Sequence, residues 1–549
     1  MAFFKIHLTE KVKGILLVVG FGALAFASYL TRTHLTSKFN FKKTKKPNQS
    51  KIQFKTIIEN LSKLPHISSE FEKDVLFDSL FELRVALDKY EISSEELLIT
   101  YFHRLKKALK HNCISDLSLE QALLQAKILD RELKYETKRG IFHGIPISVK
   151  ENISVRGMKS SICNKNLVYT QDSLIIEALR QQGAIFYISG SMPEDIRLYE
   201  TDNSFTGKAT NPFSHYRTTG DSSDAALIVL GCAPLTISSD LNGSIRVSAS
   251  YCGLFGLRAT SKRISQLGQD GLFKDFPGLS VGIGPMGKST DDCAAFMKAV
   301  CSDYVYQRDM SIPRIPWDEK AYKDSRKLKI GYIESNKYWP LPSCMEAAIY
   351  IAKVALEDHE FVKIELPDME TINELFSSIF MSSNDANIYP KKAKSLTHHE
   401  KDSFLSKSAN LHSSHDYVKN LIKIEKIKQE FFKKWAQEGI DVIIAPYPVP
   451  ATILDSCEDL FPSFAYVTFF NLLDCPAGNV PVDCVRQNEQ IYEETSEKWT
   501  KVMKDNMRNS IGMPLGVQVI APPYREELCL NVMKQIEEKT LFWKKVNIN

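Results

Sequence analysis

Several common site signatures are missing from this 549-residue sequence. Its eleven cysteines form no Cys-x-x-Cys pair, and its twelve histidines form no His-Glu-x-x-His motif. Cysteines that are odd in number and widely scattered are typical of free thiols in a reducing compartment. The sequence therefore gives no sign of a disulfide scaffold or a zinc site, and we expect neither a metal nor another cofactor.

A strong charge of either sign is also lacking. The net charge is only +4, with 44% hydrophobic and 25% charged residues. Such a composition is typical of a folded globular protein and excludes a broadly basic nucleic-acid binder. We expect no nucleic-acid partner.

Long apolar runs are scarce, with one clear exception at residues 14–30 (GILLVVGFGALAFASYL). Its 17 uncharged residues reach the lower limit for a membrane-spanning helix. A cleaved secretory signal is the alternative, because Lys11 and Lys13 precede the run and Ala25-Phe26-Ala27 resembles a cleavage site. We favour an uncleaved anchor, on the charge distribution around the run.

The basic residues that follow the run outnumber those that precede it. The positive-inside bias then places the larger, C-terminal part in the cytosol, with the endoplasmic reticulum as the expected membrane. Export to the lumen would also expose Asn152 and Asn242 as glycan acceptors. The expected organisation is an N-terminal flank (residues 1–13), a transmembrane helix (14–30), a polybasic linker (31–55) and one large domain (56–549).

Helical and strand patterns alternate through this large domain. A capping box at Ser93 begins a helix to about residue 110, a second helix covers residues 117–134, and a strand ends at Lys150. A helix over residues 172–183 and a strand over 184–188 follow, and a later helix and strand are expected at residues 419–437 and 441–446. Alternation of this kind predicts an α/β fold, a central mixed sheet covered by helices. Residues 386–418 are polar and are expected to form an exposed excursion.

Two small-residue loops stand out, at residues 220–224 and 238–244, on either side of an apolar helical run at 225–230. Loops of this composition gather hydroxyls and backbone N–H groups at the ends of elements. On composition alone they are ordinary turns. The order in which these segments follow one another along the chain is a more specific signal than their composition.

The sequence resembles the amidase signature family in three ordered segments: residues 144–151 (GIPISVKE), 220–225 (GDSSDA) and 240–246 (DLNGSIR). Residues 252–258 (CGLFGLR) are similar to the strand that follows in that family. Residues 474–478 (DCPAG) and the N-terminal span narrow the resemblance to its fatty-acid amide hydrolase branch.

This resemblance implies a membrane-anchored serine hydrolase that cleaves fatty-acid amides. It implies Ser244 as nucleophile, Ser222 as relay and Lys150 as base, a role that lysine fills only when neutral. The oxyanion donors implied are the backbone N–H groups of Leu241, Asn242, Gly243 and Ser244, and Ile196 is implied as a backbone contact to substrate. The partners expected are a lipid amide, the bilayer and a second copy of the chain.

Two departures from the family pattern put activity in question. Asp221 stands where the family has a glycine, and Asn242 replaces a glycine in the oxyanion turn. A carboxylate at position 221 is expected to approach Lys150 and favour its charged form, which cannot act as a base. A catalytically impaired pseudoenzyme of the same fold therefore remains an alternative.

A rival motif belongs to a different class of protein. Residues 282–289 (GIGPMGKS) match the Gly-x-x-x-x-Gly-Lys-Ser pattern of a phosphate-binding loop, and residues 290–300 fit the helix that such a loop requires. The strand before it would be very short, and no apolar strand ending in aspartate supplies a magnesium ligand. A nucleotide-binding protein is accordingly the remote alternative.

Overall fold

The computed structural model describes residues 79–135, 137, 139–161, 167–193, 199–203, 205–270, 277–335, 339–385, 413–492 and 498–546. All of them fall within one compact unit, Pro47–Asn549. The predicted N-terminal flank, membrane span and linker all lie outside the described residues. No helix within the described part of the chain is long and apolar enough to cross a membrane.

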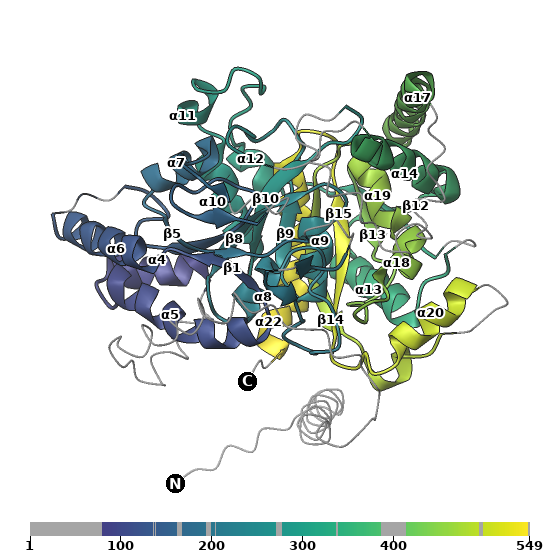
Figure 1. Cartoon of the computed structure of the whole chain (residues 1–549). Helices are drawn as coiled ribbons and strands as arrows, with labels where there is room; N and C mark the ends of the chain where they lie inside the picture. Colours follow the sequence, from purple (N-terminus) through teal and green to yellow (C-terminus); the bar gives the residue numbers. More distant parts are fainter. Residues whose placement is uncertain are drawn as a thin grey trace, which may run out of the picture. The chain divides into compact units, whose positions relative to one another are not determined.

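A mixed sheet of 11 strands runs through this unit (Figure 1). In spatial order its strands are β1 (Ile114–Leu117), β5 (Ile185–Gly190), β2 (Pro146–Lys150), β8 (Leu235–Asp240), β10 (Gly282–Gly287), β9 (Phe255–Arg258), β14 (Ala477–Cys484), β15 (Pro514–Ile520), β13 (Val442–Pro446), β11 (Lys329–Tyr332) and β12 (Glu360–Lys363). Two small sheets pair β3 (Lys159–Ser160) with β4 (Leu167–Val168) and β6 (Asp202–Asn203) with β7 (Gly207–Lys208).

Parallel pairing is confined to the two sides of the large sheet. On one side β2 is parallel to β5 and β8, and on the other β11 is parallel to β12 and β13. The strands between them pair in antiparallel fashion. The predicted α/β fold with a central mixed sheet is confirmed.

Helices flank the sheet along its length. They are α4 (Leu80–Asp88), α5 (Ser94–Lys110), α6 (Leu119–Lys134), α7 (Leu174–Gln181), α8 (Asp224–Val229), α9 (Ser244–Tyr251), α10 (Thr290–Val300), α11 (Asp303–Tyr306), α12 (Glu319–Tyr322), α13 (Ser343–Ala355), α14 (Met369–Asp385), α17 (Ser414–Glu438), α18 (Cys457–Leu460), α19 (Ala465–Leu472), α20 (Lys498–Met507), α21 (Glu526–Thr540) and α22 (Phe542–Lys545), with the 3₁₀ helices η3 (Phe461–Phe464) and η4 (Gln487–Glu489).

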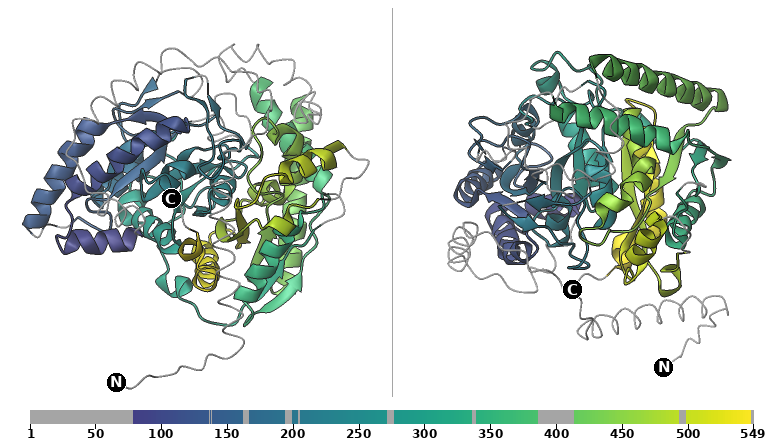
Figure 2. Two further views of the ribbon diagram at one scale, coloured as in Figure 1. Left: turned by 90° about the horizontal axis from the view of Figure 1, so that it is seen from below. Right: turned by 45° about the vertical axis from the view of Figure 1, so that its right-hand side comes forward.

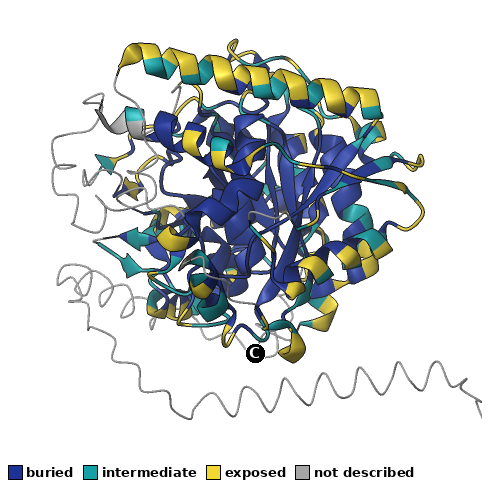
Figure 3. Ribbon diagram, turned by 90° about the vertical axis from the view of Figure 1, so that its right-hand side faces the viewer, coloured by how far each residue is buried: buried dark blue, intermediate teal, exposed yellow. Residues whose placement is uncertain are grey.

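The helices fall into two groups in space. Figure 2 shows the purple-to-blue helices beside one end of the sheet and the green helices beside the other. Figure 3 shows the sheet buried between helices whose outer faces are exposed, most plainly along the long α17. The burial follows from the strands themselves, since β2, β5, β8, β13 and β15 consist of buried residues throughout and so need cover on both faces.

Two predictions that rested on a clear local pattern, a helix start and a strand end, are confirmed. Ser93 caps α5 through a complete capping box with Glu96, and β2 ends at Lys150 as expected. The predicted excursion at residues 386–418 lies mostly outside the described residues. Its last part is wrong, because α17 already begins at Ser414, capped by the Ser413 side chain. That cap supplies the helix start which the polar composition concealed.

The phosphate-loop interpretation is also wrong. Residues 282–287 form β10, paired through its whole length with β8 and in part with β9. A Cβ atom on Gly284 would lie 1.7 Å from the backbone oxygen of Leu257, so this glycine allows a neighbouring chain to approach closely. The helix N-terminus behind it is also occupied, because the Asp292 carboxylate accepts the backbone N–H groups of Lys288 and Ser289 at 2.9 Å.

Candidate active site

Three segments that are far apart in the sequence meet at one edge of the sheet. Strands β2 and β8 are parallel, with Val149 opposite Ile237, so their carboxyl ends lie together. Lys150 ends β2, and the turn after β8 leads directly into α9 at Ser244. Helix α8 contacts both strands, and Ser222 lies just before it. The structure thus brings the three predicted catalytic residues together and buries them, at 3%, 0% and 4% exposure in chain order.

The hydroxyls of the two serines are bonded to aspartates. Ser244 Oγ donates to Asp221 Oδ2 at 2.5 Å, and Ser222 Oγ donates to Asp224 Oδ2 in a short hydrogen bond. Lys150 Nζ donates to the backbone oxygen of Ser239 at 3.4 Å. Within the described residues no hydrogen bond links Lys150 to either serine. Lys150, Ser222 and Ser244 therefore lie near one another, but the hydrogen-bonded relay expected from the sequence is not formed.

Both aspartates are buried beside the positive charge of Lys150. Burial raises the pKa of Asp221, and the charge of Lys150 and the hydrogen bond from Ser244 oppose that rise. Burial likewise raises the pKa of Asp224 to about 6 against the hydrogen bond from Ser222 and the charge of Lys150. The charge of Lys150 therefore acts on Asp221, as expected from the sequence. Among the described residues, however, the two groups form no ion pair within 4.0 Å.

Asp224 should destabilise the fold at neutral pH. A carboxyl whose pKa is higher in the folded than in the unfolded state makes folding less favourable above that pKa, because the folded protein then holds a buried charge. A rise from 3.8 to about 6 corresponds to about 3 kcal/mol. We expect Asp224→Asn to raise the free energy of unfolding by up to that amount above pH 6, and the gain to vanish as the pH falls toward 4.

Urea denaturation at several pH values measures this difference. The matched control is Asp505→Asn, which removes a carboxylate that is 45% exposed and should change stability by about 0.5 kcal/mol or less. An Asp224→Asn gain that persists unchanged at pH 4 would contradict the electrostatic explanation.

The turn before Ser244 is held by a buried charge network. Asp240 Oδ1 accepts the Gly243 N–H at 2.7 Å, and Oδ2 accepts the Ile245 N–H at 3.2 Å, so this carboxylate caps the first turn of α9. Burial alone would raise the pKa of Asp240, but the guanidinium groups of Arg246 and Arg258 hold it below its usual range. Arg246 Nε lies 3.2 Å from Asp240 Oδ2. The Gly243 N–H, an implied oxyanion donor, is thereby already engaged.

Two further residues complete the network from the C-terminal part of the chain. Asn471 Nδ2 donates to Asp240 Oδ1 at 2.8 Å, and Arg246 Nη1 donates to Gln518 Oε1 at 2.8 Å. Sequence reasoning gave neither residue a role, because nothing in the segments around them indicates a partner more than 200 residues away. Asp240 and Arg246 lie in one of the ordered motifs, but the sequence indicated no role for them. In the structure they hold the turn before Ser244 in place.

Of the other implied substrate contacts, Ile196 lies outside the described residues. Leu241 is partly buried against the core, and the Asn242 side chain is 1% exposed. Neither the nitrogen nor the oxygen of the Asn242 amide has a hydrogen-bond partner within the described residues. A buried amide without partners is costly, so this group is available to a bound molecule.

The sequence and fold comparisons agree with this geometry. Residues 96–530 match the family model described as Amidase. The chain belongs to the amidase family. It is 28% identical over 512 residues to fatty acid amide hydrolase 1 of Caenorhabditis elegans, covering 83% of this chain and 87% of that protein. It is 25% identical over 491 residues to fatty-acid amide hydrolase 1 of Sus scrofa, covering 81% and 83%.

Among solved structures, this amidase is similar to one titled fatty acid amide hydrolase. The TM-score is 0.75 at 22% sequence identity, and the match covers 90% of this chain and 91% of the other. At that identity the likeness establishes the fold. The eleven-stranded sheet is therefore the family's α/β fold.

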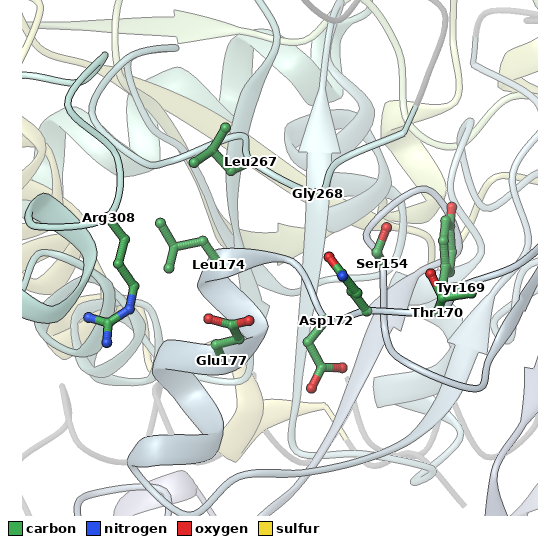
Figure 4. A pocket seen from close by; sticks show the side chains of 10 residues that line it. Ser154, Tyr169, Thr170, Asp172, Leu174, Glu177, Leu267, Gly268 and Arg308 are labelled. Atoms are coloured by element: carbon green, nitrogen blue, oxygen red, sulfur yellow. The ribbon is translucent and has the colours of Figure 1, made fainter.

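A separate cavity of about 390 Å³ lies away from the three predicted catalytic residues of this amidase, none of which lines it. Figure 4 shows side chains from its lining. Its acidic groups already have protein partners: Asp172 accepts Arg180 Nε at 2.9 Å, and Glu177 accepts the Tyr304 hydroxyl at 3.3 Å. Within the described residues no cluster of histidine, cysteine, aspartate or glutamate is placed to hold a metal ion.

Proposed function

We propose that this amidase hydrolyses fatty-acid amides, namely N-acylethanolamines and primary fatty amides, to a fatty acid and an amine. Ser244 is the proposed nucleophile, with Ser222 and Lys150 as its proton-handling partners and an acyl-enzyme as intermediate. The observation that carries the proposal is a buried serine at the start of α9, on a turn fixed by Asp240 and Arg246, with Lys150 and Ser222 beside it.

An aromatic cluster beside the nucleophile turn supports an apolar acyl group. A Cβ atom on Gly243 would lie 3.4 Å from Tyr199, whose ring stacks on Phe464 at 3.7 Å between centroids. Phe461 lies 6.0 Å from Tyr199 and 6.2 Å from Phe376, so the cluster extends from η3 to α14. These buried rings offer the low-polarity surroundings that a fatty acyl chain prefers. The printed names of the relatives point to the same substrate class.

We also propose that residues 14–30 anchor the enzyme in a membrane, that of the endoplasmic reticulum, with the catalytic domain in the cytosol. The basic excess after this run supports the orientation. Asn152 and Asn242, the two acceptor asparagines nearest the site, are 4% and 1% exposed, which is unsuited to carrying a glycan. Glycosylation of Asn152 in cells would contradict this topology.

A fluorophosphonate probe tests the hydrolase directly. The full-length protein should be labelled on the peptide that carries Ser244 and should hydrolyse oleamide, and Ser244→Ala should lose both. Ser248→Ala, on the same helix, is the control and should keep both. An unlabelled, inactive but folded wild type would favour the pseudoenzyme, a second candidate that rests on the two serines being bonded to aspartates.

A further inference from the structure

The hydroxyl of Ser244 has one carboxylate acceptor at short range, Asp221. The Oγ–Oδ2 distance is 2.5 Å, which is typical of a hydrogen bond from a hydroxyl to a carboxylate. Asp221 is only 8% exposed, and its other oxygen, Oδ1, has no hydrogen-bond partner within the described residues. The contact joins the loop before α8 to the first residue of α9.

The two other groups expected to take the Ser244 proton, Ser222 and Lys150, are hydrogen-bonded to other partners. Ser222 donates its hydroxyl to Asp224, which also lies 3.4 Å from Ser238 Oγ. Lys150 donates to the backbone oxygen of Ser239. A proton leaving Ser244 through Ser222 would require both of these contacts to break first. A proton leaving toward Asp221 requires no rearrangement.

We propose that Asp221 is the general base for Ser244 in this amidase, so that a serine–aspartate pair does the work expected of the lysine relay. The inference rests on the proposed function in taking Ser244 as the nucleophile and an amide as the substrate, and it replaces the proton-handling role given there to Ser222 and Lys150. Lys150 is then a positioning residue that compensates the two buried carboxylates with its positive charge.

The proton balance of this route is complete. As Ser244 Oγ attacks the acyl carbon, its proton passes to the Asp221 carboxylate, and negative charge develops on the carbonyl oxygen. The tetrahedral intermediate collapses when Asp221 returns the proton to the departing nitrogen, which breaks the C–N bond and leaves an acyl ester on Ser244. Water then attacks the ester, gives its proton to Asp221, and Asp221 reprotonates Ser244 as the fatty acid leaves.

The surroundings of Asp221 suit this role. Burial and the nearby negative charge of Asp240 raise its pKa, which makes it a stronger base than an exposed aspartate. The charge of Lys150 and the bond from Ser244 act against that rise in pKa and favour the ionised form of the carboxylate. The phenol of Tyr199 also faces Asp221, and burial raises its pKa well above the usual value, so it stays neutral throughout.

The proposal predicts the pH dependence of Ser244 reactivity. A carboxylate base is active once it is ionised, so the second-order rate of fluorophosphonate labelling should rise with pH as Asp221 ionises and then level off. A lysine base would instead become active as it loses its proton, and the rate would keep rising at alkaline pH. This profile is measured on the wild-type, full-length protein.

Two substitutions at Asp221 give the sharper test. Asp221→Asn keeps the shape but cannot accept the proton, and the labelling rate should fall about 10²–10⁴-fold. Asp221→Gly restores the family residue. Under this proposal it should also be slower than wild type, whereas a lysine relay freed from a neighbouring carboxylate should be faster. The control is Asp292→Asn, a buried carboxylate at the N-terminus of α10, which should label at the wild-type rate.

Each outcome decides between the ideas. A faster Asp221→Gly variant overturns the assignment of Asp221 and leaves the proposed hydrolase standing. A folded wild type that is not labelled at any pH overturns the proposed function itself. If neither variant at Asp221 folds, the wild-type profile decides: a labelling rate that levels off supports the aspartate, and a continued alkaline rise refutes it.

Discussion

Replacing Arg246 with methionine should lower the free energy of unfolding by about 3–5 kcal/mol. Methionine fills a similar volume but leaves Asp240, which is fully buried, with only the Arg258 guanidinium at 3.8 Å to balance its charge. It also removes the donor that Arg246 Nη1 supplies to Gln518 Oε1 at 2.8 Å. An uncompensated buried charge is among the few single changes that cost this much.

Urea denaturation of the purified variant measures the loss. The matched control is Arg326→Met, which removes an ion pair to Asp441 from an arginine that is 48% exposed and should cost about 1 kcal/mol or less. Adding Asp240→Asn to Arg246→Met should recover part of the lost stability, because the group that lost the Arg246 guanidinium is then neutral, while Arg258 keeps its ion pair with Asp474 at 2.9 Å. Equal losses for the two arginine variants would show that the network around Asp240 contributes little.

Replacing Gly243 with alanine should reduce the rate of Ser244 labelling by about 10²-fold. The residue has φ = +102°, and an added Cβ would lie 2.7 Å from Val467 Cγ1 and 2.9 Å from Val247 Cγ2. The turn must therefore shift, and a shift of about 1 Å in a reacting group costs roughly 10²-fold in rate. The nucleophile immediately follows this residue, so the shift reaches Ser244 directly.

A second glycine provides the comparison. Gly439 ends α17 with φ = +65°, and an added Cβ there meets nothing within 4 Å. Gly439→Ala should cost about 1 kcal/mol in stability through the left-handed backbone alone, with labelling unchanged. Wild-type labelling of Gly243→Ala would show that the turn tolerates a side chain.

The sequence predicted those parts of the fold that depend on local chemistry. The Ser93 capping box located the start of α5, and the apolar run before Lys150 located β2, because caps and buried strands are determined by neighbouring residues. The glycines of β10 misled for the same reason. Gly284 admits the backbone of β9, a contact between segments that no short motif reveals, and the same spacing of glycines also suits a phosphate loop.

For the site, too, the sequence predicted the features that local motifs indicate and missed those that depend on packing. Lys150, Ser222 and Ser244 were found through ordered motifs, and the influence of Asp221 on Lys150 was expected from charge alone. The direct bond from Ser244 to Asp221 was not predicted, because its length depends on how α8 and α9 pack. Asn471 and Gln518 were missed because their partner, Arg246, lies in a distant part of the chain.

That distance has a consequence for how the protein is made. Arg246 bonds to Asn471 and Gln518, which follow it by 225 and 272 residues. A ribosome adding about 5–20 residues per second needs roughly 15–55 s to reach Gln518 after Arg246. Through that interval the emerging chain carries Asp240 and Arg246 without these two partners, and β9 without β14. The turn before Ser244 therefore cannot take its final form until the chain has been synthesised past Gln518, which delays hydrolytic competence until then.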